Sequence, residues 1–127
     1  MDICVIGAGY VGLTSSAVLA DLGHHVTCVD KNKERIQALN NGESPIFEPG
    51  LSELIQKNQN RLIFTNQVGE AIQKNSCVII CVGTPSLPDG SSNLSYVLSV
   101  VDDLAVNITS KKTIITKSTV PLGTNEM

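Results

Sequence analysis

A glycine-rich stretch near the amino terminus carries the first pattern with the chemistry to bind a ligand. Gly7–Gly12 reads G-A-G-Y-V-G, which fits G-x-G-x-x-G and directly follows an apolar run at positions 3–6. In such a turn the first glycine permits the bend, the second lets the backbone approach a pyrophosphate, and the third lets a helix lie close to the strand. The helix N-terminus adds free N–H groups and a positive dipole end. The residues expected to contact a dinucleotide here are Gly7, Gly9, Tyr10, Val11 and Gly12.

Asp30 is the acid that this motif requires on the next strand. It ends the apolar run 26–29 and lies 18 residues after Gly12. Its carboxylate can accept hydrogen bonds from the 2′- and 3′-hydroxyls of an adenosine ribose, and each bond to a charged acceptor contributes about 1.5–3 kcal/mol. A 2′-phosphate would meet like charge there, so Asp30 favours NAD over NADP. The alternative is a solvated cap of the next helix.

Three cations after Asp30 favour NADP instead of NAD. Lys31, Lys33 and Arg35 could tolerate a 2′-phosphate, but they lie further into the turn and helix, whereas Asp30 stands at the strand end. We therefore expect the carboxylate to decide and NAD to be the cofactor. Arg35 is a candidate to lie over the adenine or ribose edge, and an exposed helix charge is the alternative.

Two further turns carry hydroxyl groups after apolar runs. Gly83 and Thr84 follow the run 77–82, and Ser118 and Thr119 follow the run 113–116. Each turn alone is typical of an ordinary loop with a capping hydroxyl. Beside a dinucleotide motif, both are expected to flank the nicotinamide half of the bound cofactor.

The histidines and cysteines point to no catalytic or metal site. His24 and His25 fall between the first helix and the second strand, at the end of the sheet away from the expected site, where a solvated turn is the simpler interpretation. The spacings include no C-x-x-C, H-x-x-H or G-x-S-x-G pattern. The cysteines all lie in or beside apolar runs, so we expect reduced thiols packed as small hydrophobic groups: Cys4, Cys28, Cys77 and Cys81.

Apolar runs alternate with helical patterns along the chain, and this order predicts the fold class. Strands are expected at 3–6, 26–29, 62–64, 77–82 and 113–116, and the first helix should run to about Leu22 and stop at Gly23. Further helices are expected around 36–39, 51–55, 68–72 and 94–105. The pattern predicts an α/β fold, a Rossmann-type doubly wound parallel sheet in a single domain over residues 1–127. Ligands of such sheets bind at the carboxyl ends of the strands.

Composition excludes several other classes of protein. The 127 residues are 42% hydrophobic and 17% charged, which is too apolar for a disordered chain. The net charge is −3 and neither half of the chain is basic, so nucleic acid is not expected as a partner. No apolar run approaches ~18 residues, and no basic region precedes the first one. We therefore expect no membrane span and no signal peptide, and a cytoplasmic protein.

Five segments together make the sequence resemble the UDP-glucose/GDP-mannose dehydrogenase family. They read I-G-A-G-Y-V-G-L at 6–13, I-F-E-P-G-L at 46–51, V-G-T-P at 82–85, N-L-S-Y-V at 93–97 and K-S-T-V-P-L-G-T at 117–124. The glycine motif is common to many enzymes, whereas E-P-G-L, V-G-T-P and K-S-T-V-P-x-G-T in this order are far more particular. Within the family, the pattern is most similar to bacterial enzymes that act on UDP-glucose, and members acting on GDP-mannose or UDP-N-acetylmannosamine share much of it.

The resemblance implies a four-electron oxidation of a sugar-nucleotide alcohol to its carboxylate with two NAD, UDP-glucose giving UDP-glucuronate. At the matching positions Val11, Asp30, Arg35, Thr84 and Thr119 would contact NAD, with Thr119 near the reacting centre. Glu48 lies in a matching loop and receives no role. The resemblance also implies a homo-oligomer for the full-length enzyme.

Two departures from the family pattern matter. Asn93 replaces the usual Asp, which changes a helix cap. The family's nucleophilic cysteine, in a glycine-rich segment ending C-x-P-K-D, has no counterpart in the 127 residues, and its catalytic lysine and asparagine are also missing. We therefore expect an amino-terminal NAD-binding domain that catalyses nothing alone. Two alternatives stay open: a non-catalytic NAD-sensing module, and an S-adenosylmethionine methyltransferase, which also pairs a glycine loop with a strand-end acid.

Overall fold

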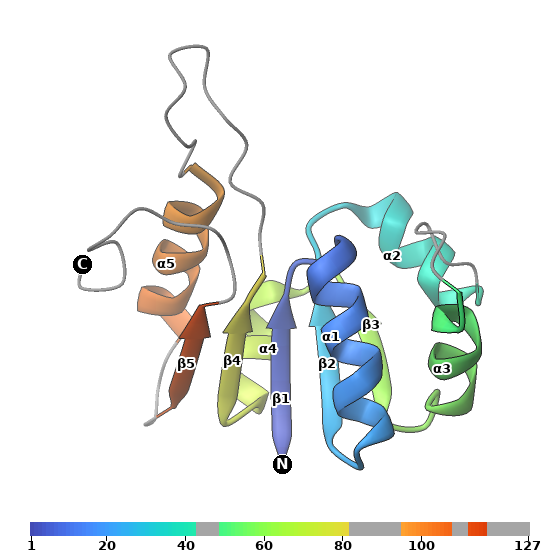
Figure 1. Cartoon of the computed structure of the whole chain (residues 1–127). Helices are drawn as coiled ribbons and strands as arrows, with labels where there is room; N and C mark the ends of the chain where they lie inside the picture. Colours follow the sequence, from blue (N-terminus) through green and yellow to red (C-terminus); the bar gives the residue numbers. More distant parts are fainter. Residues whose placement is uncertain (43–48, 82–94, 108–111, 117–127) are drawn as a thin grey trace, which may run out of the picture.

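The computed structural model describes residues 1–42, 49–81, 95–107 and 112–116. These residues form a five-stranded, fully parallel sheet with helices on both faces (Figure 1). In chain order the elements are β1 (Asp2–Ile6), α1 (Tyr10–Asp21), β2 (His25–Val29), α2 (Lys33–Asn40), α3 (Leu51–Lys57), β3 (Leu62–Thr65), α4 (Val68–Lys74), β4 (Cys77–Ile80), α5 (Ser95–Asn107) and β5 (Thr113–Thr116). The predicted fold class is confirmed.

The strand order β3-β2-β1-β4-β5 places a switch point at the middle of the sheet. From β1 the chain builds outward through β2 to β3, and then returns to add β4 and β5 on the other side of β1. The helices that follow β1 and β4, α1 and α5, therefore lie on opposite faces, and in open α/β sheets ligands bind beside the carboxyl ends of such strands. This geometry places the end of β1, and the glycine turn that follows it, at the usual ligand position of an open α/β sheet.

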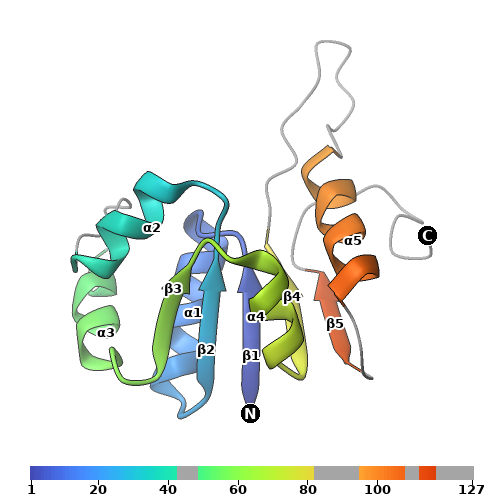
Figure 2. The same ribbon diagram turned by 180° about the vertical axis from the view of Figure 1, so that it is seen from behind.

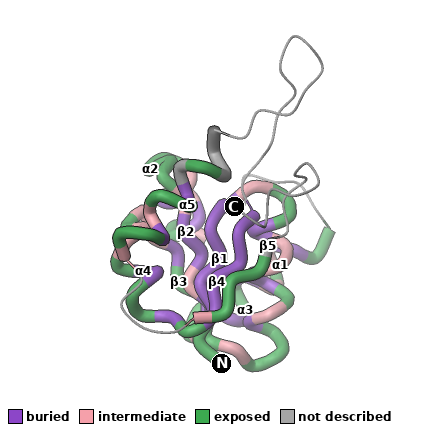
Figure 3. The backbone as a smooth tube through the Cα atoms, turned by 90° about the vertical axis from the view of Figure 1, so that its left-hand side faces the viewer, coloured by how far each residue is buried: buried purple, intermediate pink, exposed green. Residues whose placement is uncertain are grey.

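Two layers of helices cover the sheet, and each has its own core. α1, α2 and α3 pack on one face and α4 and α5 on the other, as Figures 1 and 2 show from opposite sides. Side chains alternate between the cores along each strand, so Val5 joins the first core and Cys4 and Ile6 the second. Because β1 and β4 are covered on both faces, they are buried almost throughout and read as continuous apolar runs (Figure 3).

The first helix shows how the local sequence determines packing. Its buried residues recur at helical spacing on one side: Gly12, Leu13, Ser16, Ala17 and Ala20. The helix ends at Asp21, and Gly23 has a φ of +102°, in the left-handed region that glycine adopts without strain. The predicted glycine stop is confirmed. His25, predicted to lie in the turn, instead begins β2, and both histidines are at the amino edge of the sheet.

The fourth strand is shorter than the apolar run that predicted it. β4 ends at Ile80. Cys81 lies just beyond the strand, and its N–H donates a hydrogen bond to the Ile6 carbonyl. Cys81 is nevertheless buried, because it packs beneath the glycine turn. The apolar run in the sequence is longer than the strand because Cys81 is buried although it lies outside β4. The prediction that Cys81 belongs to the strand was wrong. Val82 lies outside the described residues.

One face of β2 and β3 carries a hollow beside α4, on the side of the sheet opposite α1. Seven residues line it: Thr27, Ile63, Thr65, Glu70, Ala71, Lys74 and Asn75. Ile63 is 59% exposed there, and Lys74 pairs with Glu70 one helical turn away on α4. Among the described residues, no helix has the length and apolar character to cross a bilayer.

A polar contact ties the end of α1 to the end of α3. Asp21 Oδ1 lies 3.0 Å from Lys57 Nζ and accepts a hydrogen bond from the Asn58 amide at 3.2 Å. The hydrogen bond with Lys57, then that with Asn58, holds the pKa of Asp21 below its usual value. A carboxyl group with a lowered folded pKa stabilises the fold above its unfolded pKa, and the contribution disappears as pH falls through the folded pKa.

We predict that Asp21→Asn lowers the urea midpoint at pH 7 relative to the unsubstituted chain, and that the gap closes as pH falls below about 4, near the usual carboxyl pKa. Urea unfolding at a series of pH values measures this. The matched control is Asp102→Asn, an exposed carboxylate on α5, for which no such gap is expected. A gap of constant size between pH 7 and pH 3 would contradict the assignment.

Candidate dinucleotide-binding site

The glycine turn leaves β1 at the switch point and leads into α1. Gly7 has a φ of +109°, which a residue with a side chain adopts only with strain, and its N–H bonds the Val29 carbonyl at 2.7 Å. Gly9 is the N-cap of α1, which has no side-chain cap and no acidic residue in its first turn. Among the described residues no side chain caps the first N–H groups of this helix, and an anion placed there would meet the positive end of the helix dipole.

Gly12 is required by packing. A Cβ atom added to Gly12 would lie 1.8 Å from the Gly7 carbonyl oxygen and 3.3 Å from the Cβ of Cys81. No rotamer change can relieve a clash with backbone, so the close approach of α1 to the turn depends on the missing side chain. The predicted role of the third glycine is confirmed.

Gly9 faces open space, in contrast to Gly12. A Cβ atom added at Gly9 would meet nothing within 4 Å. The neighbouring side chains turn outward, with Tyr10 55% and Val11 44% exposed. The backbone over the turn is therefore uncovered by described side chains, as contact with a pyrophosphate requires. By this test the turn fits a dinucleotide.

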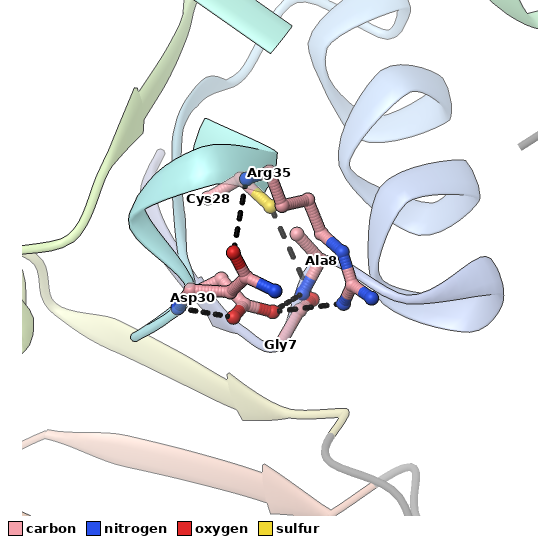
Figure 4. A network of polar contacts seen from close by, with 6 residues as sticks. Gly7, Ala8, Cys28, Asp30 and Arg35 are labelled. Carbon is pink, nitrogen blue, oxygen red and sulfur yellow. Dashed lines mark hydrogen bonds and ion pairs between the residues drawn. The ribbon is translucent and has the colours of Figure 1, made fainter. Parts of the chain in front are cut away.

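Asp30 directs its carboxylate at the glycine turn (Figure 4). Its Oδ2 accepts a hydrogen bond from the Ala8 backbone N–H at 2.9 Å, and its Oδ1 accepts one from the Asn32 backbone N–H at 2.9 Å. The Arg35 guanidinium lies 3.4 Å from Oδ2. A carboxylate has about four lone-pair positions, so these contacts leave acceptor capacity for a ribose hydroxyl. With 17% of its side chain exposed, Asp30 is both held and accessible.

Asn32 positions the two charged residues of this network. Its side-chain oxygen accepts a hydrogen bond from the Arg35 backbone N–H at 3.1 Å, which makes Asn32 the N-cap of α2. Its own N–H binds Asp30, so one residue fixes both the carboxylate and the start of the helix that carries Arg35. Arg35 is half-buried and pairs with Asp30, with 38% of its side chain exposed.

The Lys31 side chain pairs with a residue of α5, whereas that of Arg35 pairs with Asp30. Its Nζ lies 3.3 Å from Oδ2 of Asp103 on α5, a helix of the second layer. Asp103 Oδ2 is buried and accepts no hydrogen bond from the described groups, and the ammonium supplies the opposing charge. An ion pair thus spans from the turn after β2 to the far face of the sheet.

The four cysteines are free and buried, as predicted. Burial raises the pKa of Cys28 to about 12, with smaller upward contributions from Asp30 and Cys81 and an opposing hydrogen bond from Ser16. Burial also raises the pKa of Cys4 to about 12 and shifts that of Cys77 upward. At neutral pH the thiols of Cys4 and Cys28 are protonated, in keeping with their buried positions in the two cores.

The structure brings together seven of the predicted site residues at the carboxyl ends of β1 and β2: Gly7, Gly9, Tyr10, Val11, Gly12, Asp30 and Arg35. The other four, Gly83, Thr84, Ser118 and Thr119, lie outside the described residues. Sequence reasoning missed Ala8, Asn32 and Asp103. The D-x-N spacing before a helical run is a turn-and-cap signal for Asn32. Nothing in the sequence pairs Lys31 with Asp103.

The model of the UDP-glucose/GDP-mannose dehydrogenase family, NAD-binding domain, matches residues 1–127. A UDP-glucose 6-dehydrogenase of Rhizobium meliloti is 47% identical over 129 residues, covering 99% of this chain and 30% of the relative. One of Pseudomonas aeruginosa is 44% identical over 128 residues, covering 99% of this chain and 28% of the relative.

A solved structure gives the same result. A GDP-mannose dehydrogenase from Pseudomonas aeruginosa, determined as a ternary complex, superposes with a TM-score of 0.94 at 37% identity, over 99% of this chain and 30% of that one. The chain thus spans about three tenths of the length of these relatives.

The contrast between Gly12 and Gly9 yields a matched stability test. We predict that Gly12→Ala destabilises the fold by about 1–3 kcal/mol, the usual cost of overpacking, because the added methyl group meets backbone. Gly9→Ala is the control, with the same chemical change in open space. Urea unfolding of both variants measures the difference. Equal stability of the two variants would show that α1 does not depend on this close approach.

Proposed function

Because the chain belongs to the UDP-glucose/GDP-mannose dehydrogenase family, as its NAD-binding domain, we propose that the glycine turn and Asp30 hold the adenosine half of NAD. The pyrophosphate would rest on the turn and the first N–H groups of α1, and the ribose on Asp30. Residues 1–127 would form one cofactor-binding domain. The residues we assign to NAD are Gly7, Gly9, Tyr10, Val11, Gly12, Asp30 and Arg35, with Gly83, Thr84, Ser118 and Thr119 at the nicotinamide half.

One observation carries this assignment: the Asp30 carboxylate faces the glycine turn rather than solvent or α2 alone. The hydrogen bond from Ala8 N–H at 2.9 Å holds the ribose acceptor beside the expected pyrophosphate position. A ligand that offers a diphosphate next to a ribose diol, the adenosine half of NAD, matches this pair of features. When bound, NAD supplies the hydride acceptor, and the described residues bind and orient it.

The charge at Asp30 also supports discrimination against NADP. A 2′-phosphate placed on the ribose would meet the carboxylate at close range, and like charges in a partly buried site repel strongly. The cation nearest to Asp30, Arg35, is already paired with it. The site as described therefore favours a free 2′-hydroxyl.

For the intact protein we propose the oxidation of UDP-glucose to UDP-glucuronate with two NAD. The support is the similarity to UDP-glucose 6-dehydrogenases along nearly all of the chain. A second candidate substrate is GDP-mannose, favoured by the close superposition on a GDP-mannose dehydrogenase, and UDP-N-acetylmannosamine is a third within the family. The described residues contact the cofactor side, so the choice among sugar nucleotides rests on similarity.

The proposal extends to the setting of the enzyme. The free thiols are consistent with a reducing compartment, so we place the protein in the cytoplasm. A homo-oligomer is proposed for the intact enzyme on the family resemblance alone.

Substitution of Asp30 tests the proposed ribose site. Asp30→Ala should weaken NAD binding by about 10- to 150-fold, because each hydrogen bond to a charged acceptor is worth about 1.5–3 kcal/mol. Calorimetric titration of the chain with NAD, NADP and S-adenosylmethionine measures it. Asp2→Asn, at the amino edge of the same sheet, is the control and should bind NAD normally. Unchanged NAD affinity in the Asp30 variant, or preference for S-adenosylmethionine, would refute the assignment.

The number of NADH molecules released per sugar tests the proposed reaction. The intact protein should release two NADH per UDP-glucose, because an alcohol loses four electrons in becoming a carboxylate and each NAD accepts two. The present chain, which lacks the C-x-P-K-D segment, should release none. Absorbance at 340 nm measures both, with GDP-mannose and UDP-N-acetylmannosamine as parallel substrates. One NADH per sugar, or NADH from the chain alone, would contradict the proposal.

A further inference from the structure

We propose that Asp103 on α5 acts on cofactor specificity by holding Lys31 away from the adenosine ribose, so that this ammonium does not offset the repulsion that Asp30 offers to a 2′-phosphate. The inference rests on the proposed ribose site at Asp30. It assigns a role in nucleotide choice to a residue that lies 73 positions after Asp30 and on the opposite face of the sheet.

The position of Lys31 makes it the relevant cation. Lys31 directly follows Asp30 at the end of β2, and a basic residue near the ribose acid is what accommodates a 2′-phosphate in dinucleotide sites. An ammonium on a flexible four-carbon stem can reach such a phosphate if nothing else holds it. Without a restraint, Lys31 would offset the repulsion that Asp30 offers to NADP.

Asp103 provides that restraint. Its Oδ2 lies 3.3 Å from Lys31 Nζ, and α5 packs in the second core, through Val100 and Leu104, on the face opposite α1. The pair therefore draws the ammonium toward α5 and away from the face where α2 and the glycine turn lie. Arg35 is held in the same manner by Asp30 at 3.4 Å. Each of these two cations next to the ribose acid thus has a carboxylate partner.

The burial of the acceptor argues that the pair is more than a chance surface contact. Oδ2 of Asp103 is buried and accepts no hydrogen bond from the described groups, while 31% of the side chain is exposed; among the described residues, the Lys31 ammonium is its ion-pair partner. A buried carboxylate oxygen without a partner is unfavourable, and this bias holds Lys31 in place. Lys31 itself is 62% exposed, so the restraint is a moderate one.

The experiment is a double-mutant cycle in which the affinities for NADP and for NAD are measured for each variant and compared. The chain is titrated calorimetrically with each dinucleotide for the unsubstituted protein, Asp103→Asn, Lys31→Ala and the double variant. Asp103→Asn should tighten NADP binding by about two- to fivefold, the range of an exposed ion pair, and leave NAD binding unchanged. In the Lys31→Ala background the same substitution should do nothing for NADP. Asp102→Asn, a neighbouring exposed carboxylate on α5, controls for the general loss of negative charge.

Thermal unfolding of each variant is followed in parallel, and Asp103→Ser is the second neutral variant if Asp103→Asn folds poorly. Three results overturn the inference: no change in NADP affinity, an equal gain for NAD and NADP, or a gain that persists without Lys31. Failure of the unsubstituted chain to bind NAD would overturn the proposed function and this inference with it. Normal NAD binding with an unchanged NADP affinity would overturn this inference alone.

Discussion

The hydrogen bond from the Ala8 backbone N–H to the Asp30 carboxylate joins the ends of two adjacent parallel strands. It connects the turn after β1 to the first residue after β2, 22 positions later in the chain. Because the two strands are in register from Asp2 with His25 to Ile6 with Val29, their ends arrive at the same level, and the turn and the acid meet without distortion. The glycine turn and the Asp30 carboxylate therefore form one unit, whose geometry follows from strand register.

Two kinds of constraint surround this bond. The first constraint is packing. Gly7 and Cys81 leave no room for a side chain at Gly12, so α1 can lie against the turn only because residue 12 is glycine. Charge acts from the side, since Asn32 and Arg35 orient the carboxylate while Lys31 is drawn to Asp103. The first constraint sets the position of the helix N-terminus, and the second sets the charges around the proposed ribose acceptor. Cys81, Asn32, Arg35, Lys31 and Asp103, which contribute to these constraints, lie outside the glycine motif.

Local pattern was sufficient for most of the fold. Apolar runs predicted the five strands, helical spacing predicted four helices, and an Ala- and Leu-rich stretch ending at Gly23 predicted the first helix; together these are the ten elements of the described residues. The exception at Cys81 shows the limit: burial and strand formation usually coincide, but here a residue outside the strand is buried by a neighbouring turn. Sequence alone cannot separate the two cases, since both require an apolar side chain.

The site was predictable where a motif joins residue type to spacing, as for Gly12 and Asp30. It was not predictable where the contact depends on how separate helices pack. Asp103 reaches Lys31 only because α5 lies on the second face of the sheet at the height of the β2 end, and no local pattern encodes that arrangement. Ala8 has no side-chain chemistry to attract notice, yet its N–H holds the acid.

The central claim, that a diphosphate rests on the glycine turn, is tested most directly by nuclear magnetic resonance. The backbone amide signals of the ¹⁵N-labelled chain would be followed during titration with NAD. The account predicts that the largest shifts occur at the amides of Gly9, Tyr10 and Val11. It would be contradicted if these signals stayed in place while those of the hollow beside α4, such as Thr27, Ile63 and Lys74, moved.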